Sequence, residues 1–392
     1  MRTFFKLVHK WLSIPAGIII FIVCLTGSIL IFEKEILRLI YPERYEVESA
    51  GRTPLPLSEL IPMANKQLKN NSVAGITVSS NPNTTYTIRL SEGFRSSAFI
   101  DQYTGRVTGV YMYNEGFFYK MLTLHRWLMD GSRTWGKYTV GISTILFVVI
   151  LISGVVVWVP KKGRKWKSRF VVTAKKGRRR LYYDLHVVLG IYVCIFLLVC
   201  SLTGLMWSFQ WYRDGVFSLF GAEAKVESAH GGKGGNQNGK GGGAGGKGKA
   251  AGEGRKGKAG NRAEKQESIN IAHWDDVLAE LQISVPNYKT ISLQDGSASV
   301  LTKDAPHLRA NDSYRFDAQQ GNITEVSLYK DAEKGSKVML WAYNLHVGAY
   351  GGIWTRILTC IACLIGASLP ITGYYLFFVK EKRKKDKKAT TN

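Results

Sequence analysis

The sequence predicts a membrane α-helical protein with four transmembrane helices in two duplicated halves, each half with an external α+β domain. Three observations support this prediction: four long apolar runs, positive charge concentrated beside those runs, and a helix-and-strand pattern that occurs twice. The chain has 392 residues, which is enough for more than one domain.

Four apolar runs are long enough to cross a bilayer. Each holds at least twenty residues with essentially no charge, which matches the roughly 20 residues that a hydrocarbon core of ~30 Å requires. A buried helix of a soluble protein is the alternative for one such run, but four of them favour a membrane. The runs cover residues 11–32, 138–159, 187–209 and 357–379.

The first run could instead be a cleaved signal peptide, because Arg2, Lys6 and Lys10 precede it. Its apolar stretch is too long for that, and Phe32-Glu33-Lys34-Glu35 follows where a small-residue cleavage site would stand. We therefore expect an uncleaved first span.

Positive charge is concentrated beside the spans. The net charge is +24, and residues 160–180 contain eleven lysines or arginines and no acidic residue. Residues 1–10 and 380–392 are also basic. A nucleic-acid-binding protein would instead carry a basic patch on a folded domain. By the positive-inside rule, both termini and the middle loop are cytoplasmic, as expected for a multi-pass protein of the bacterial inner membrane in contact with membrane lipid.

The expected domain order alternates membrane and external segments. Within the second external domain, residues 231–265 are rich in glycine and lysine, which predicts a disordered loop that no single function explains. The segments are the N-terminus and helix one (1–33), external domain one (34–118), an interfacial segment and helix two (119–160), a basic cytoplasmic loop (161–181), helix three (182–212), external domain two (213–340), an interfacial segment and helix four (341–379), and a basic cytoplasmic tail (380–392).

The two external domains share a pattern of one helix followed by strands. The clearest internal match is a tight turn with an aspartate at its start and a glycine four residues later, at Asp101–Gly105 and at Asp317–Gly321. Aspartate begins such turns by accepting backbone hydrogen bonds, and glycine supplies a positive φ. Two such turns in equivalent places indicate a duplication.

Four of the seven histidines lie where a membrane span begins: His9, His125, His186 and His346. Ionisable residues at membrane depth are rare and suggest function. His9 and His186 begin outward-running helices, whereas His125 and His346 precede inward-running ones. The topology therefore pairs His9 with His186 on the cytoplasmic side and His125 with His346 on the external side.

Two histidines on facing helices can ligate a haem iron from both faces, which favours electron transfer over oxygen chemistry. Zinc would usually require four ligands, including cysteine or carboxylate, and no third ligand is evident at either level. The sequence therefore predicts two haems, each with two histidine ligands. Because glycine-rich or polar residues separate His125 and His346 from their spans, these two histidines could lie on short interfacial helices.

Residues near the histidines support the same sites. Lys10 and Arg126 directly follow a histidine, so each could meet a haem propionate through a charge-assisted bond. A hydroxyl residue followed by glycine stands near the opposite end of each span. We expect these glycines to let the haem plane pack closely, although ordinary small-residue helix packing explains them equally well. They are Gly27, Gly154, Gly204 and Gly373.

The five cysteines all lie within spans, so the sequence implies no disulfide framework in the external domains. Cys360 and Cys363 have the spacing of a redox pair, but in an apolar helix cysteine usually behaves as a small hydrophobic residue.

The chain resembles the PepSY-associated transmembrane family over nearly its whole length. The resemblance rests on Leu-Thr-Gly in the first and third spans, Leu-His-Arg-Trp-Leu before the second, and Asn-Leu-His with Ile-Thr-Gly-Tyr in the fourth. The two external domains resemble PepSY modules. The resemblance implies an iron-regulated inner-membrane protein with two b-type haems, similar to ferric-siderophore reductases, whose axial ligands would be His9, His125, His186 and His346. The chain departs from the family pattern in its glycine-lysine loop and in Leu128-Met129-Asp130, where glycine is frequent.

The leading hypothesis is a transmembrane ferric-chelate reductase. Electrons would pass from the cytoplasmic haem to the external haem and reduce iron in a periplasmic siderophore or similar chelate. No nucleotide-binding glycine motif is present, so the donor would be a separate cytoplasmic reductase or a membrane quinol. Two alternatives are a non-redox PepSY binding or regulatory protein, and a metal or solute transporter, for which the only hint is Pro370 beside Thr372-Gly373.

Overall fold

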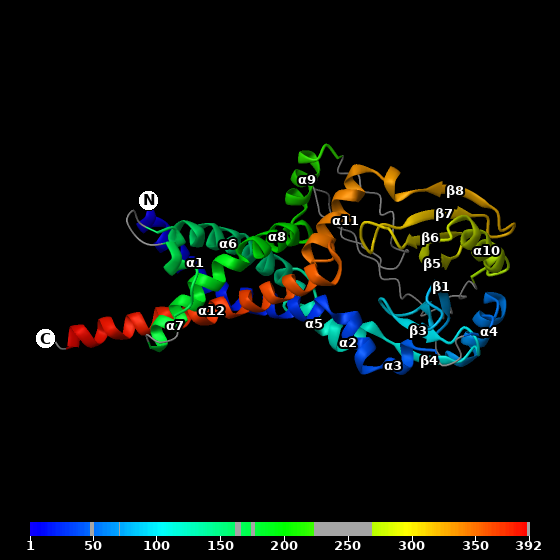
Figure 1. Cartoon of the computed structure of the whole chain (residues 1–392), viewed down its shortest axis with the longest axis horizontal. Helices are drawn as coiled ribbons and strands as arrows, with labels where there is room; N and C mark the ends of the chain where they lie inside the picture. Colours follow the sequence, from blue (N-terminus) through cyan, green and yellow to red (C-terminus); the bar gives the residue numbers. More distant parts are fainter. Residues whose placement is uncertain (48–50, 70, 161–165, 174–176, 223–268, 390–392) are drawn as a thin grey trace, which may run out of the picture.

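The computed structural model divides into a bundle of long helices and a β-sheet region beyond one end of it (Figure 1). It describes residues 1–392 except 48–50, 70, 161–165, 174–176, 223–268 and 390–392, so the predicted loop at 231–265 lies outside the described residues. The start of α1 and the end of α12 both lie at the end of the bundle that is far from the sheet (Figure 1).

All four predicted spans are helical and long and apolar enough to cross a membrane, so the protein is a multi-pass membrane protein. Each begins several residues before the apolar run found in the sequence. The third contains a break in its helical register, with α7 (Arg178–Asp184), a π-helical turn η4 (Leu185–Leu189) and α8 (Gly190–Ser208). The four spans are Arg2–Ile31, Trp135–Trp158, Arg178–Ser208 and Gly352–Val379.

The bundle packs around a core of buried side chains contributed by all four spans. Ile20 of α1 (Arg2–Ile31), Phe147 of α6 (Trp135–Trp158) and Leu197 of α8 meet there with Ala367 of α12 (Gly352–Ala389). Because the surrounding lipid is itself apolar, this core is held by close packing more than by exclusion of water.

Each external module contains one helix and four antiparallel strands, close to the segments that the sequence predicts. The first has α4 (Leu57–Gln67), β1 (Val73–Ser79), β2 (Tyr86–Leu90), β3 (Ser97–Ile100) and β4 (Val107–Tyr111). The second has α10 (Trp274–Ser284), β5 (Tyr288–Gln294), β6 (Ser297–Thr302), β7 (Asp312–Phe316) and β8 (Ile323–Ser327).

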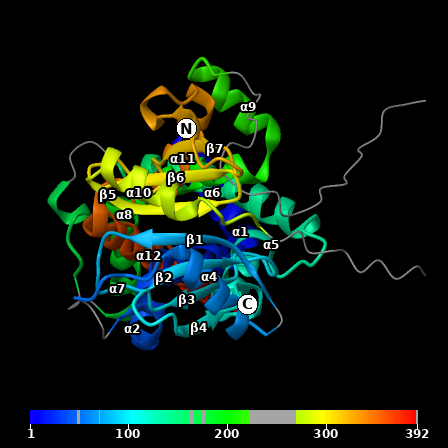
Figure 2. The same ribbon diagram turned by 90° about the vertical axis from the view of Figure 1, so that its right-hand side faces the viewer.

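The two modules join into a single eight-stranded sheet in the order β4-β3-β2-β1-β5-β6-β7-β8. The seam is an antiparallel pairing of β1 with β5, in which Ile76 lies opposite Leu293 and Val78 lies opposite Ile291. Helices α4 and α10 cover the face that points away from the bundle (Figure 2). The sequence analysis treats the modules as separate domains and does not predict this seam.

Both predicted aspartate-glycine turns are confirmed. The Asp101 carboxylate accepts hydrogen bonds from the Tyr103 N–H at 2.9 Å and the Thr104 hydroxyl at 2.7 Å, and Gly105 has a φ of +69°. Asp317 accepts from the Gln319 N–H at 2.7 Å, and Gly321 has a φ of +77°. The turns lead into β4 and β8 respectively.

Short helices connect the sheet to the bundle. In both halves the last strand is followed by a 3₁₀ turn, a short helix and then a span, so the order of elements repeats. The connecting elements are α2 (Glu33–Ile40), α3 (Pro42–Tyr45), η1 (Tyr113–Glu115), α5 (Phe117–Trp127), α9 (Gln210–Leu219), η5 (Tyr329–Asp331) and α11 (Lys334–His346), and η2 (Trp166–Arg169) follows the second span.

Candidate functional site

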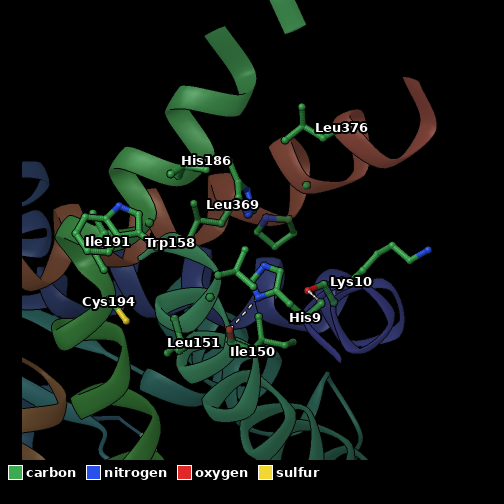
Figure 3. A pocket seen from close by; sticks show the side chains of 18 of the residues that line it. His9, Lys10, Ile150, Leu151, Trp158, His186, Ile191, Cys194, Leu369 and Leu376 are labelled. Carbon is green, nitrogen blue, oxygen red and sulfur yellow. Dashed lines mark hydrogen bonds between the residues drawn. The ribbon is translucent and has the colours of Figure 1, made fainter. Parts of the chain in front are cut away.

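The first histidine pair lies at the end of the bundle that is far from the sheet. His9 comes from α1 and His186 from the π-helical turn η4, and Figure 3 shows both in one cavity. Their ring centres are 6.2 Å apart and their planes cross at 85°. The structure therefore brings together the two histidines that topology assigns to the cytoplasmic level.

The second pair lies on the sheet side of the bundle. His125 is near the end of α5 and His346 is the last residue of α11, so both lie on short helices outside the spans. Their ring centres are also 6.2 Å apart, with planes at 65°. The structure confirms that both residues lie on separate short helices, as the residues between them and their spans suggest.

All four imidazoles are held through Nδ1 by a neighbouring helix. A carbonyl oxygen can only accept, so three of the Nδ1 atoms must carry the proton. No described residue forms a hydrogen bond with Nε2 of any of the four, which leaves Nε2 as the free nitrogen. The Nδ1 contacts are His9 with Ile150 O (3.0 Å) and Ser153 Oγ (3.2 Å), His125 with Val23 O (2.9 Å) and Thr26 Oγ1 (3.2 Å), His186 with Thr372 Oγ1 (2.9 Å), and His346 with Cys200 O (2.9 Å) and Thr203 Oγ1 (3.1 Å).

The glycine after each of these hydroxyl residues lies against the imidazole. A Cβ at Gly27 would be 3.1 Å from His125 Cε1, and one at Gly204 would be 3.1 Å from His346 Cε1. The corresponding distances are 3.2 Å from Gly154 to His9 and 3.5 Å from Gly373 to His186. The sequence analysis expects these glycines to admit the plane of a haem. In the structure they admit the edge of a histidine ring.

The spacing of each pair would let both imidazoles hold one metal. With metal–nitrogen bonds of about 2 Å and a ring centre roughly 1 Å behind each nitrogen, two imidazoles that share a metal would have their centres up to about 6 Å apart. Among the described residues, no group of three or more histidine, cysteine, aspartate or glutamate side chains could hold a metal ion. A bound group such as a porphyrin could supply the further ligands of a metal held between the histidines.

The cavity around His9 and His186 has a volume of about 350 Å³, within the usual range for small-molecule sites. Its walls are mostly apolar, with Ile150, Leu151 and Leu369 beside the rings (Figure 3). Lys10 and Arg169 supply positive charge at its rim. An apolar body with a cationic edge matches the two chemical faces of a haem.

The cavity around His125 and His346 is similar in size, about 340 Å³. It is lined by apolar side chains of the spans and by a set of charged residues on the sheet side. The predicted Arg126 is one of these. The charged lining residues are Glu33, Arg95, Arg126, Lys137 and Arg309.

The two cavities approach each other inside the bundle. Ile20 and Phe147 line both of them, and both side chains are buried. Along α1, His9 and the carbonyl that holds His125 are fourteen residues apart, which corresponds to about 20 Å at 1.5 Å per residue. Ile20 and Phe147 therefore form part of the wall between the two cavities.

Burial favours the uncharged form of both outer histidines. Burial, with a smaller effect of the neighbouring His346, lowers the pKa of His125 to about 4. Burial also lowers the pKa of His346. A neutral imidazole with a free Nε2 is the form that binds a metal.

The residues after His125 explain how α5 turns into the second span. Leu128 and Met129 have φ values of +51° and +64°, the left-handed region that glycine adopts most easily. Asp130 then caps α6, since its carboxylate accepts from the Thr134 N–H at 2.8 Å and the Gly136 N–H at 3.1 Å. Leu128 and Met129, which stand where the family often has glycine, therefore adopt a backbone conformation that glycine would adopt with less strain.

His186 owes its position to a feature that the sequence analysis does not predict. The π-helical turn η4 inserts one residue into the helical register, and such turns are frequent at functional sites. The preceding Asp184 is buried, accepts from Thr173 N–H at 3.1 Å and pairs with Arg180 at 2.9 Å. These contacts fix the start of the third span beside the cavity.

The remaining histidines differ from one another. His230 lies outside the described residues, and His273 contacts Asp276 at 3.1 Å. His307, to which the sequence analysis assigns no role, is buried between Tyr329 and Trp341 and lies two residues before Arg309 of the outer cavity. Its position in a loop gave no sequence signal of burial.

All five cysteines are free thiols.

Comparison with protein families shows which family the chain matches. The family model described as the PepSY-associated TM region matches residues 7–380, which include all four histidines and both external modules. A search of curated proteins finds no match.

Proposed function

Since the chain belongs to the PepSY-associated transmembrane family, we propose that it is a two-haem electron-transfer protein of the bacterial inner membrane. One observation carries this proposal: two facing histidine pairs, each with ring centres 6.2 Å apart, lie at opposite ends of a membrane bundle. His9 and His186 would hold one haem b, and His125 and His346 the other. A haem with two imidazole ligands cycles between ferric and ferrous iron and has no open position for oxygen.

The protein's own residues prepare each site before anything binds. Hydrogen bonds from Nδ1 fix the tautomer and the direction of Nε2, which raises ligand basicity and lowers the reorganisation that binding requires. Apolar walls would exclude water from the bound group, while Lys10 and Arg126 line the two cavities and could each pair with an acidic group of the bound molecule. Gly27, Gly154, Gly204 and Gly373 provide the space in which the imidazoles stand.

We infer which site faces the cytoplasm, and hence the direction of electron transfer, from the distribution of basic residues. The basic N-terminus, middle loop and tail would be cytoplasmic by the positive-inside rule, which puts the His9–His186 site on the cytoplasmic side and the sheet in the periplasm. The electron donor would be a cytoplasmic reductase or a membrane quinol. The acceptor would be ferric iron in a siderophore or a similar chelate.

The proposed reaction transfers one electron per iron. The donor is oxidised by one electron on the cytoplasmic side, and Fe(III) in the periplasmic chelate becomes Fe(II). Oxygen-rich chelators hold Fe(II) less tightly than Fe(III), so reduction releases the metal for uptake. The chain would thus act as a transmembrane ferric-chelate reductase.

We also infer that the two halves arose by duplication. The order of external helix, four strands, 3₁₀ turn, short helix and span occurs in both, with an Asp–Gly turn before the last strand of each. Each histidine pair takes one ligand from each half, so duplication would create both sites in one event.

The deciding experiment is an absorbance spectrum of purified protein before and after dithionite, with haem counted per chain. We expect two haems in the wild type. His9→Ala and His186→Ala should each remove the same one, and His125→Ala and His346→Ala should each remove the other. His273→Ala, at a half-buried position in the second external module, is the control and should retain both. Absence of any haem spectrum from the wild type would refute the proposal.

The same variants separate this function from a non-redox role. If the helices only anchor external binding modules, His125→Ala and His346→Ala would leave the biological activity intact. The proposed reductase instead loses ferric-chelate reduction in all four histidine variants, because a break at either site interrupts transfer.

A further inference from the structure

Each external module sends one arginine to the outer cavity from an equivalent loop. Arg95 lies in the β2–β3 loop, two residues before β3, and Arg309 lies in the β6–β7 loop, three residues before β7. Both line the cavity of His125 and His346. Each external module therefore contributes one cationic side chain to the outer cavity.

Aromatic rings hold both arginines. The Arg95 guanidinium lies 5.3 Å from the centre of the Phe94 ring and 5.8 Å from that of Tyr113, and the Arg309 guanidinium lies 3.5 Å from that of Tyr343. A guanidinium that stacks on a ring keeps its N–H groups available in the plane, where they can bind a carboxylate with two parallel hydrogen bonds. The Tyr343 ring can thus orient Arg309 without using its donors, whereas Arg95 also forms a hydrogen bond with the Tyr113 side chain.

The two supporting rings, Tyr113 and Tyr343, line the same cavity. Tyr113 supports Arg95 and Tyr343 supports Arg309, so the two arginines face one region of the cavity.

Positive charge in this region exceeds negative charge. Arg126 and Lys137 line the same cavity, and Glu33 is its one carboxylate among the described residues. None of the four cations forms an ion pair within the described part of the chain. Like charges gathered at a partly buried site repel one another unless an anion joins them.

A buried histidine fixes the loop that carries Arg309. The Arg309 backbone N–H donates to His307 Nδ1 at 3.2 Å, so the proton of the neutral ring is on Nε2, which donates to the Tyr329 hydroxyl at 3.0 Å. His307 also packs edge-on against Trp341 of α11, with ring centres 5.1 Å apart. Because α11 carries His346, the loop and the histidine are tied to the same helix.

We propose that Arg95 and Arg309 together form an anion site at the outer cavity that binds carboxylate groups. The proposal rests on the proposed function for the identity of the carboxylate: it belongs either to the propionates of the outer haem or to an anionic ferric chelate that approaches it. In both cases the two modules would act as one clamp, with one arginine from each side of the β1–β5 seam.

The test compares Arg95→Gln, Arg309→Gln and the double variant with wild type in the full-length protein. Arg106→Gln is the control, because Arg106 is an exposed arginine of the first module that does not line the cavity. Two measurements are made: the midpoint potential of each haem by spectroelectrochemical titration, and the affinity for citrate and ferric citrate by isothermal titration calorimetry.

If the carboxylates are those of the haem, each variant lowers the midpoint potential of the outer haem, because loss of a nearby cation favours the ferric state. The affinity for citrate is then unchanged. If they belong to the chelate, each single variant weakens citrate binding roughly tenfold, as the loss of one charge-assisted contact implies. The inner potential stays constant in both cases.

Unchanged potentials and unchanged citrate affinity in the double variant, relative to Arg106→Gln, would overturn the proposal. This failure is distinct from failure of the proposed function. A wild type without haem would remove the first measurement, but calorimetry on that protein would still show whether the arginines bind the tricarboxylate.

Discussion

The substitution Gly27→Ala tests how tightly the outer imidazole is held. A Cβ at this position would lie 3.1 Å from His125 Cε1 and 3.5 Å from His125 Nδ1. Ordinary van der Waals contacts with a Cβ lie at 3.4–4 Å, so the ring must move by a few tenths of an ångström. Nδ1 donates to the Val23 carbonyl at 2.9 Å on the same helix, which opposes that movement.

Two opposing effects set the change in stability that Gly27→Ala causes. Overpacking of a buried contact costs about 1–3 kcal/mol, whereas alanine in place of glycine stabilises a helix by roughly 1 kcal/mol. We therefore expect a net loss of up to about 2 kcal/mol at the outer site, and a disturbance of the ligand support that weakens haem affinity by roughly 10- to 100-fold. The inner site should be unaffected.

Gly373→Ala is the matched control. There the Cβ would lie 3.5 Å from His186 Cε1, an ordinary contact, so the helix gain should dominate and both haems should remain. Haem content per chain and low-spin ferric signals in electron paramagnetic resonance spectra measure the outcome. Equal behaviour of the two variants, with two haems and unchanged spectra, would show that the glycines do not limit the position of the imidazoles.

Three further substitutions probe other parts of the reasoning. Thr372→Val removes the hydroxyl that holds His186 Nδ1 at 2.9 Å, so the inner haem should dissociate about tenfold faster while the outer haem is retained, as measured by haem transfer to apomyoglobin. Met129→Gly relieves a left-handed backbone position and should stabilise the protein by about 1 kcal/mol in thermal melts; a lower melting temperature would contradict this. Gly75→Val places a Cβ 2.8 Å from the Leu293 carbonyl and should increase hydrogen exchange in β1 and β5, whereas unchanged exchange would show that the seam tolerates the change.

Much of the fold could be predicted from the sequence because it depends on local patterns. Apolar length predicted the four spans, and the turns at Asp101 and Asp317 combine a side-chain acceptor with a glycine, which few other conformations satisfy. The histidine pairing followed from topology alone: helices that run in alternate directions place their starts at two levels.

The features that the sequence did not predict depend on contacts between distant segments. The β1–β5 seam pairs Ile76 with Leu293, and nothing in either strand distinguishes an edge that faces solvent from one that faces another module. The π-helical turn at His186 requires one extra residue in a register that periodicity does not resolve. Arg95 and Arg309 lie in loops, where the sequence does not indicate what a side chain will face.

The β1–β5 seam constrains the outer histidine pair but not the inner one. His9 lies on a span and His186 on the turn that begins one, so their separation is set by the bundle. His125 and His346 instead lie on α5 and α11, which follow the last strands of the two modules. Because β1 and β5 join the modules, the sheet constrains the distance between these two helices. A change that opens the seam should therefore loosen the outer pair and leave the inner pair intact, and loss of the inner haem first would contradict this division.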